Sequence, residues 1–165
     1  MKRSGPWPAL LGFGAAVAAA AVFGSRFGPQ NPRTKDWYNQ LAKPSWNPPN
    51  AVFPLVWPAL YALMTVAAVR TSRQPASPQR SVALTLWTSQ LLANAAWTWL
   101  FFGRQAPKQA LVDVIVLEGL IVGFVLTAQK VDRPAAICFL PYAGWVGFAT
   151  LLNAEIVILN PAKAA

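Results

Sequence analysis

Apolar residues fall in five long runs along the 165-residue chain. Short segments that carry most of the Lys and Arg residues separate these runs. Each run is close to the ~20 residues that an α-helix needs to cross ~30 Å of hydrocarbon. The pattern therefore predicts an all-α fold, an integral membrane bundle of five transmembrane helices in one domain over residues 1–165. The predicted spans are 7–25, 51–69, 81–102, 109–129 and 135–159, with a structured loop at 26–50.

The first run has a second interpretation. Lys2 and Arg3 before an alanine-rich stretch are also typical of a secretory signal peptide. Small residues recur in this run at four-residue spacing, which makes one helix face that another helix can approach closely. They are Gly12, Ala16, Ala20 and Gly24. This stripe favours a span that remains part of the bundle.

Composition and charge agree with a membrane protein. Hydrophobic residues make up 55% of the chain and charged residues 12%, whereas soluble domains carry roughly 25% charged residues. The chain has a net charge of +9, and its Lys and Arg residues lie outside the apolar runs. Each Lys or Arg near the membrane surface gains about 1 kcal/mol from anionic lipid head groups. The lipid bilayer is therefore a predicted partner. Nucleic acid is not, because no basic helix with interleaved aromatic residues appears.

The chain lacks the usual equipment for group-transfer chemistry. It contains no His, which removes the usual general base, metal ligand and axial haem ligand. Cys138 stands alone inside the fifth run, where a small buried hydrophobe is the expected role. We therefore predict no catalytic residue, no metal site and no obligatory cofactor.

Two predicted helices carry a stripe of polar and aromatic residues on one face. Side chains three or four positions apart share a helix face. The third run contributes Gln90, Asn94, Trp97 and Phe101, and the fifth contributes Tyr142, Trp145, Ala149 and Asn153. Rings that stack, amides that orient and a small residue that leaves room suit a pocket for a flat, apolar ligand. Alternatively, the amides hydrogen-bond neighbouring helices, and spacing alone leaves both interpretations open.

Two carboxylates fall in the fourth run. Asp113 and Glu118 are five positions apart, ~500° around a helix, so they do not form a paired acid and base. Asp113 lies near the basic segment 104–108 and is expected to have a basic partner. Glu118 is deeper, and we predict a buried protonated or hydrogen-bonded carboxyl, with a proton-linked transport site as the alternative.

Several motifs resemble the tryptophan-rich sensory protein family, also called the translocator protein or peripheral benzodiazepine receptor family. They are WYNQLAKPSWNPP at 37–49, Trp57 with Leu60 and Tyr61, Gln90, Asn94, Trp97 and the FFG of 101–103, and LPYAGWVGFATLLN at 140–153. The resemblance implies a five-helix membrane protein, often dimeric, that binds porphyrins such as protoporphyrin IX and haem. Family members also bind benzodiazepine-type drugs, and animal members bind cholesterol.

The resemblance also implies a ligand pocket beneath the first long loop. At matching positions its residues are Trp46, Trp57, Tyr61, Asn94, Trp97, Trp145, Ala149 and Asn153. Gln90, Phe101 and Tyr142 complete the predicted ligand-binding set from the two stripes. The loop carries Pro44, Pro48 and Pro49. Because proline fixes φ and restricts the preceding residue, we predict a stiff lid that places Trp46 on a planar ligand. Anchoring at the membrane interface is the alternative role of Trp46 and Trp57.

Three function classes follow from this resemblance. The first is a tetrapyrrole-binding sensor or regulator, the second a transporter of porphyrins or other amphipathic molecules, and the third a light-dependent porphyrin-degrading enzyme. The expected location is the bacterial cell membrane, or a mitochondrial or other organellar membrane in a eukaryote.

The third predicted span carries a face of small residues, formed by Thr85, Ser89 and Ala93. This face predicts a homodimer through that helix.

Two positions depart from the animal members of the family. Gln109 stands where a Trp lines their drug site, and no Tyr follows Leu152 before Lys163, although a Tyr belongs to their proposed sterol-contact pattern. That pattern is itself weak evidence for sterol contact. We therefore expect synthetic ligands of the family and cholesterol to bind poorly.

Overall fold

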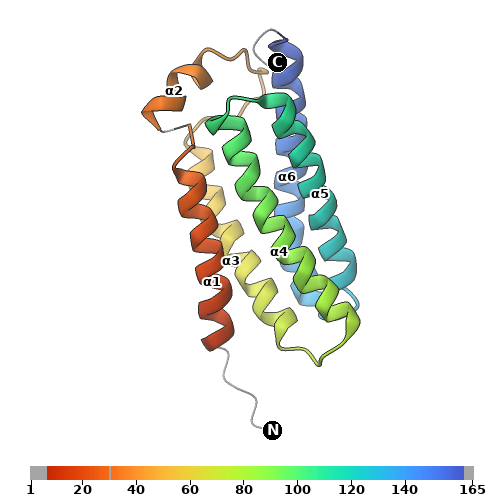
Figure 1. The fold of residues 1–165 in the computed structure, drawn as a ribbon. Helices are drawn as coiled ribbons and strands as arrows, with labels where there is room; N and C mark the ends of the chain where they lie inside the picture. Colours follow the sequence, from red (N-terminus) through yellow and green to blue (C-terminus); the bar gives the residue numbers. More distant parts are fainter. Residues whose placement is uncertain (1–6, 30, 162–165) are drawn as a thin grey trace.

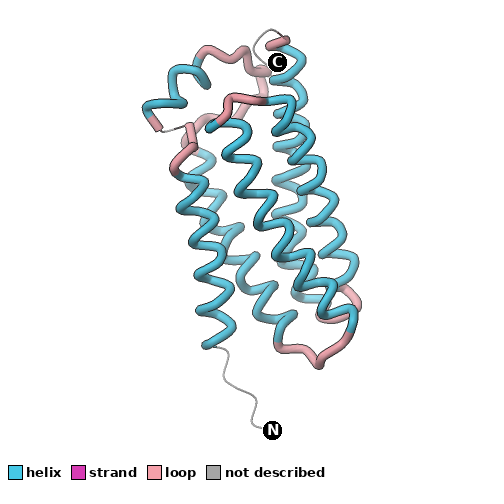
Figure 2. The backbone as a smooth tube through the Cα atoms, in the orientation of Figure 1, coloured by secondary structure: helices cyan, strands magenta, loops and turns pink. Residues whose placement is uncertain are grey.

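The computed structural model describes residues 7–29 and 31–161. These segments contain helices and loops only (Figure 2). The helices are α1 (Trp7–Ser25), α2 (Pro32–Asn39), α3 (Val52–Ser72), α4 (Pro78–Thr98), the π-helical turn η1 (Trp99–Gly103), α5 (Pro107–Ala128) and α6 (Arg133–Leu159). The predicted all-α class is confirmed.

The five long helices run side by side as a bundle (Figure 1). Helix α1 packs against α3 and α4, α5 packs against α4 and α6, and α3 packs against α6, which closes the ring. Helix α1 is therefore an integral part of the bundle. The short helix α2 lies across the end of the bundle where α1 finishes, and it contacts η1.

Several helices begin where a polar side chain caps the first turn. Ser77 Oγ accepts a hydrogen bond from Arg80 N at 3.1 Å, and Pro78 follows as the first helical residue. Asp132 Oδ1 accepts from Ala135 N at 2.8 Å at the start of α6. A side-chain acceptor satisfies a free N–H of the first turn, and proline tolerates that turn because it has no N–H to satisfy. These caps place the helix starts within the polar segments.

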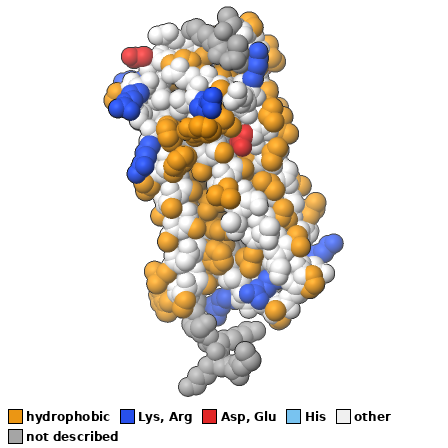
Figure 3. Space-filling model, in the orientation of Figure 1, with side chains coloured by type: hydrophobic (Ala, Val, Ile, Leu, Met, Phe, Trp, Pro, Cys, Tyr) orange, Lys and Arg blue, Asp and Glu red, His pale blue; other side chains and the backbone are white. Residues whose placement is uncertain are grey.

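The outside of the bundle is apolar along its length. Leu11, Leu55 and Leu151 are more than half exposed, and Lys and Arg gather toward the two ends (Figure 3). Four of the described helices, α1, α3, α5 and α6, are long and apolar enough to cross a membrane. Helix α4 is as long as α3 but is less apolar, because it carries Gln90 and Asn94 as well as several hydroxyl residues.

Aromatic and polar contacts join the helices inside the bundle. The Trp87 indole donates a hydrogen bond to Met64 O at 3.0 Å, which links α4 to α3. Phe13 of α1 packs edge-on against Trp87 with ring centroids 5.0 Å apart. Between α5 and α6, the ring centroids of Phe124 and Phe139 are 4.1 Å apart. The core is therefore continuous across all five long helices.

An ion pair fastens the end of the bundle opposite α2. Arg70 Nε and Nη2 donate to the two carboxylate oxygens of Asp132 at 3.0 and 3.2 Å. Gln74 Nε2 adds a hydrogen bond to Oδ2 at 2.7 Å. Because Asp132 also caps α6, this carboxylate ties the end of α3 to the start of α6.

Of the two carboxylates in the fourth predicted run, Asp113 lacks the basic partner that we expected, within the described part of the chain. Asp113 Oδ2 is buried and has no hydrogen-bond partner among the described residues, so the predicted basic partner of Asp113 is wrong. Lys108, at the start of α5, lies five positions before Asp113, ~500° around the helix, so the two side chains point in different directions. Glu118 Oε2 is also buried without a described partner. A Cβ at Gly147 would lie 3.9 Å from Glu118 Oε1, an ordinary contact distance, so the Glu118 carboxyl faces α6 near this glycine.

Candidate functional site

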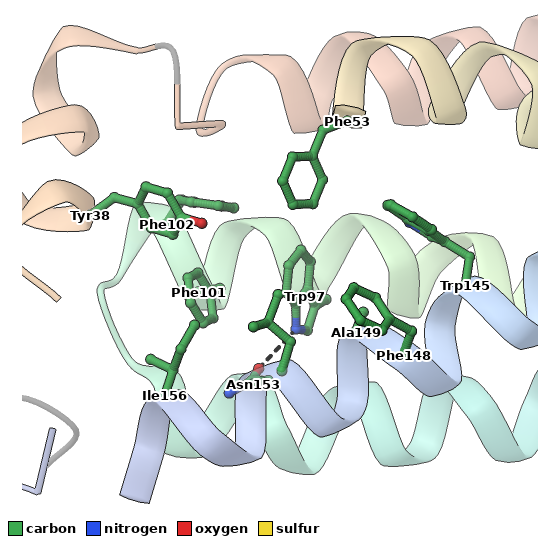
Figure 4. A pocket seen from close by; sticks show the side chains of 11 residues that line it. Tyr38, Phe53, Trp97, Phe101, Phe102, Trp145, Phe148, Ala149, Asn153 and Ile156 are labelled. Atoms are coloured by element: carbon green, nitrogen blue, oxygen red, sulfur yellow. Dashed lines mark hydrogen bonds between the residues drawn. The ribbon is translucent and has the colours of Figure 1, made fainter. Parts of the chain in front are cut away.

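An aromatic pocket lies between α3, α4, η1 and α6, beneath the loop that carries α2 (Figure 4). It is lined by Tyr38, Phe53, Trp97, Phe101, Phe102, Trp145, Phe148, Ala149, Leu152, Asn153 and Ile156. Seven of these eleven residues are aromatic. The free volume is about 40 Å³, whereas pockets for drug-sized ligands measure ~300–1,000 Å³. The pocket in this structure therefore has room for only a few water molecules.

Asn153 places a side-chain amide in the lining of this otherwise largely apolar pocket. The Trp97 indole donates a hydrogen bond to Asn153 Oδ1 at 3.1 Å (Figure 4). Asn153 Nδ2 donates to Pro107 O at 2.9 Å. One amide therefore joins α4, α5 and α6. Since both ends of the amide are engaged, its orientation and that of the Trp97 ring are fixed.

The remaining rings pack on one another around the pocket. Trp97 stacks on Phe101 with centroids 5.3 Å apart and an interplanar angle of 24°. On the α6 side, Trp145 contacts Phe53 and Phe148, each at 5.8 Å between centroids. These mutual contacts hold the rings in place and present apolar faces to the cavity.

The loop above the pocket is fastened near its middle. Asn160 and Ala42 exchange two hydrogen bonds between the amide side chain and the backbone. Lys43 Nζ donates to the carbonyls of Tyr38 and Leu41 and lies 4.3 Å from the centroid of the Tyr38 ring. Partial burial lowers the pKa of Lys43. Residues 44–51, which we call the proline strap, follow these fixed points and lead into α3.

Trp46 lies on the proline strap, at the rim of the pocket. Its ring contacts Phe148 edge-on with centroids 5.7 Å apart, and its side chain is 47% exposed. Asn47 N donates to Pro44 O at 3.0 Å and Val52 N donates to Pro49 O at 2.9 Å, so two turns stiffen the strap. Trp46 therefore covers the pocket edge without filling the pocket.

Apart from Trp46 at the rim, the structure separates the predicted ligand-binding residues into two groups. Trp97, Phe101, Trp145, Ala149 and Asn153 line the pocket. Trp57, Tyr61, Gln90, Asn94 and Tyr142 do not line it.

The second group makes contacts within the helix bundle. Asn94 Nδ2 donates to the Tyr142 hydroxyl at 3.0 Å, which joins α4 to α6. Gln90 Nε2 donates to Trp87 O on its own helix at 2.9 Å. In this structure Asn94 therefore hydrogen-bonds a neighbouring helix, as the alternative interpretation of its stripe predicted. Trp57 packs on Tyr61 with centroids 5.2 Å apart, below the pocket.

Six lining residues were not predicted from the sequence. They are Tyr38, Phe53, Phe102, Phe148, Leu152 and Ile156. Three of them lie on α6 at three-residue steps from predicted residues, so a wider stripe on this helix would have included them. Tyr38 reaches the pocket from α2, a short polar helix that a search for apolar runs does not detect. Phe102 reaches it because η1 departs from α-helical geometry.

Comparison with known proteins gives a consistent result. The model of the TspO/MBR family matches residues 13–159. The chain is 38% identical over 154 residues to the tryptophan-rich sensory protein of Cereibacter sphaeroides, covering 93% of this chain and 92% of that protein. It is 38% identical over 145 residues to the tryptophan-rich protein TspO of Chlorobaculum tepidum, covering 87% and 90%. It is 34% identical over 150 residues to the translocator protein of Homo sapiens, covering 90% and 88%. The family model spans most of the helical bundle, and the chain therefore belongs to the TspO/MBR family.

Proposed function

We propose that the protein binds a tetrapyrrole such as protoporphyrin IX or haem in the aromatic pocket and acts as a sensor or regulator. The pocket lining carries this proposal, because seven aromatic side chains converge on one cavity. A flat conjugated ring gains both apolar burial and stacking from such a lining. The Asn153 amide uses one donor and one acceptor position within the protein, and its second donor and second acceptor positions would orient a polar edge of the ligand.

Stacking, rather than metal ligation, holds the ligand in this proposal. The chain has no His, the side chain that most often ligates haem iron. Metal-free porphyrin and haem are therefore expected to bind within about tenfold of each other, ~1.4 kcal/mol. A much stronger preference for haem would contradict a site built on ring stacking.

Binding requires the closed pocket to open. A free volume of about 40 Å³ does not admit a tetrapyrrole. The proline strap is the part of the cover that lies between two fixed points, the Ala42–Asn160 contact and the start of α3. Because the strap is stiff, we propose that it moves as one unit and carries Trp46 away from Phe148.

Titration with protoporphyrin IX tests the proposal. Tryptophan fluorescence is expected to be quenched with a dissociation constant of roughly 1 μM, ~8 kcal/mol. Saturable quenching in the dark with a shifted Soret band supports a binding protein. Absence of saturable quenching would refute the proposal.

The same sample under light tests the degrading-enzyme alternative. Trp97 and Trp145 both line the pocket and would lie beside an excited porphyrin. Loss of the Soret band under light, absent in a protein-free control, would favour degradation. Transport is tested separately by porphyrin uptake into proteoliposomes.

We propose that α4 crosses the membrane together with the other four long helices, giving five spans. Gln90 and Asn94 of α4 are buried inside the bundle, whereas Val82 and Leu92 are exposed on its outer side. A helix with this distribution presents an apolar side to lipid. In a Cys138→Ala background, the single substitutions Arg80→Cys and Arg104→Cys should each react with an impermeant thiol reagent, but from opposite sides of the membrane.

We propose the bacterial cell membrane as the location, or an organellar membrane in a eukaryotic source.

A further inference from the structure

Helix α4 changes its geometry before it ends. Arg104 N donates to Trp99 O, five residues back, at 2.8 Å, as expected where the Trp99–Gly103 segment is wound as a π-helix. Just beyond the turn, Ala106 N donates to Leu100 O at 3.0 Å. Gln105 follows with φ 53°, in the left-handed region that non-glycine residues rarely adopt. π-Helical turns are rare and are frequently found at functional sites.

The π-helical turn brings neighbouring aromatic residues to one side. In an uninterrupted α-helix, Phe101 and Phe102 would point ~100° apart, and the wider π-turn reduces this angle. Both side chains are buried, at 2% and 7% exposure, and both line the pocket (Figure 4). Their centroids lie 5.3 and 6.0 Å from that of Trp97. The three rings therefore form one aromatic wall.

The same turn also supports the cover of the pocket. Tyr38 packs on Phe102 with centroids 5.4 Å apart, and Trp37 packs on Phe101 at 5.7 Å. Phe27, which precedes α2, packs directly on the backbone of Gly103. A Cβ at Gly103 would lie 2.8 Å from Phe27 Cδ1 and 3.0 Å from Trp99 Cδ1, so only glycine allows this approach.

We propose that η1 is a positioning element for ligand binding, with Gly103 as its essential residue. The turn fixes the aromatic wall formed by Trp97, Phe101 and Phe102, and it supports the segment of the cover that carries α2. This inference rests on the proposed tetrapyrrole site and adds how the site is shaped. Disturbing the turn should weaken ligand binding even though no ligand contact is removed.

A matched set of glycine substitutions tests this role. Gly103→Ala should weaken protoporphyrin IX binding about tenfold, because Phe27 and α2 must shift. Gly119→Ala is the control, since no atom lies within 4 Å of a Cβ at that position. The double variant Phe27→Ala/Gly103→Ala should bind within about threefold of Phe27→Ala, because the overlapping ring is gone and Trp99, which is 39% exposed, can move outward.

Equal binding by Gly103→Ala and wild type would overturn the inference, and so would a double variant that binds much more than threefold more weakly than Phe27→Ala. If Gly103→Ala does not fold, Trp37→Leu replaces it, because Trp37 packs on Phe101 of the turn without lining the pocket. This variant should bind at least fivefold more weakly than wild type, and unchanged binding would overturn the inference.

A ligand-independent measurement separates this inference from the proposed function. Thr34 on α2 is 6% exposed, and a Thr34→Cys substitution in a Cys138→Ala background reports how firmly α2 is held. Thiol labelling should be faster with Gly103→Ala than with Gly119→Ala, and slower again in the double variant. Equal labelling rates would refute the positioning role, whether or not the wild-type protein binds porphyrin. If the labelling pattern is as expected but porphyrin does not bind, only the proposed ligand is refuted, and the positioning role stands.

Discussion

Asn160 and Ala42 hold each other through a reciprocal pair of hydrogen bonds, although 118 positions separate them in the chain. Ala42 N donates to Asn160 Oδ1 at 2.9 Å, and Asn160 Nδ2 donates to Ala42 O at 2.9 Å. The same Nδ2 group donates to Ile156 O at 2.8 Å, within α6. One side chain therefore fixes the start of the proline strap to the end of α6.

Replacing Asn160 should loosen the cover of the pocket. Asn160→Ala removes both hydrogen bonds to Ala42, and with net contributions of ~1 kcal/mol each the protein should lose roughly 1–3 kcal/mol of stability. Porphyrin association and dissociation should both accelerate, because the strap opens more often. Stopped-flow fluorescence measures both rates. Asn39→Ala, at an exposed position of α2, is the control, and unchanged rates in Asn160→Ala would show that this contact does not restrain the strap.

Substitutions at Trp97 should distinguish ring stacking from packing. Trp97→Phe keeps an aromatic face but leaves Asn153 Oδ1 without its donor, so a moderate loss of affinity is expected. Trp97→Ala also removes apolar area and stacking and should cost ~1–3 kcal/mol of binding free energy. Fluorescence titration with protoporphyrin IX gives both values. Equal affinity in wild type and Trp97→Ala would leave Trp97 as a packing residue only.

The positions of the long helices follow from the sequence because each apolar run ends at charged or capping residues. The predicted span 7–25 coincides with α1, and the predicted spans at 109–129 and 135–159 lie within two residues of α5 and α6 at each end. Helix α4 begins three residues earlier than predicted, since Ser77 and Pro78 start a helix in a polar segment that hydropathy excludes. Helix α2 was not predicted, because its residues are polar and depend on tertiary contacts at Thr34 and Tyr38.

The candidate site could be predicted only where a regular α-helix carries it. On α6, steps of three and four residues correctly place Trp145, Ala149 and Asn153 on one side. On α4 the same rule places Trp97 and Phe101 in the pocket. It also selects Gln90 and Asn94, which lie farther along the helix from the α2 end of the bundle and do not line the pocket. A helical stripe therefore gives the face on which a residue lies and not its position along the axis of the bundle. The π-helical turn has no periodic signal in the sequence, so the contribution of Phe102 was not predicted.

Asp132 should make stability depend on pH in the acid range. Burial acts to raise the pKa of Asp132, but hydrogen bonds from Arg70, Ala135 and Gln74 and the charge of Arg70 outweigh it and hold the pKa below its ordinary value of 3.8. A lowered pKa in the folded state stabilises the protein fully above the ordinary value, and this contribution is lost as pH falls through the folded-state value.

Thermal unfolding in mild detergent, from about pH 7 to pH 2, checks this expectation. Asp132→Asn should unfold at lower temperature than wild type at neutral pH, and the difference should shrink below pH ~4. The control Asp36→Asn removes an exposed carboxylate from α2 and should behave as wild type. A difference between Asp132→Asn and wild type that stays constant down to the lowest pH would contradict this assignment.

Dimerisation through α4 should be sensitive to the size of Ser89. Thr85 is exposed and Ser89 is partly buried, whereas Ala93 already packs against the bundle core. We propose that the exposed part of this small-residue face contacts a second copy, since small residues allow close helix approach in membranes. Ser89→Leu should reduce cross-linked dimer in native membranes, and Val82→Leu, at an exposed position of the same helix, should not. Exclusively monomeric wild type would refute the dimer.

The small free volume of the pocket also sets how affinity and rate are related. At the proposed site, a tetrapyrrole would bind only those molecules in which the strap has already moved, so the apparent dissociation constant would be the intrinsic constant divided by the open fraction. An open population of ~1% weakens apparent binding ~100-fold, ~2.7 kcal/mol. At high ligand concentration the observed association rate should level off at the rate of strap opening. Substitutions that raise the open population can therefore tighten equilibrium binding while they shorten the residence time of the ligand.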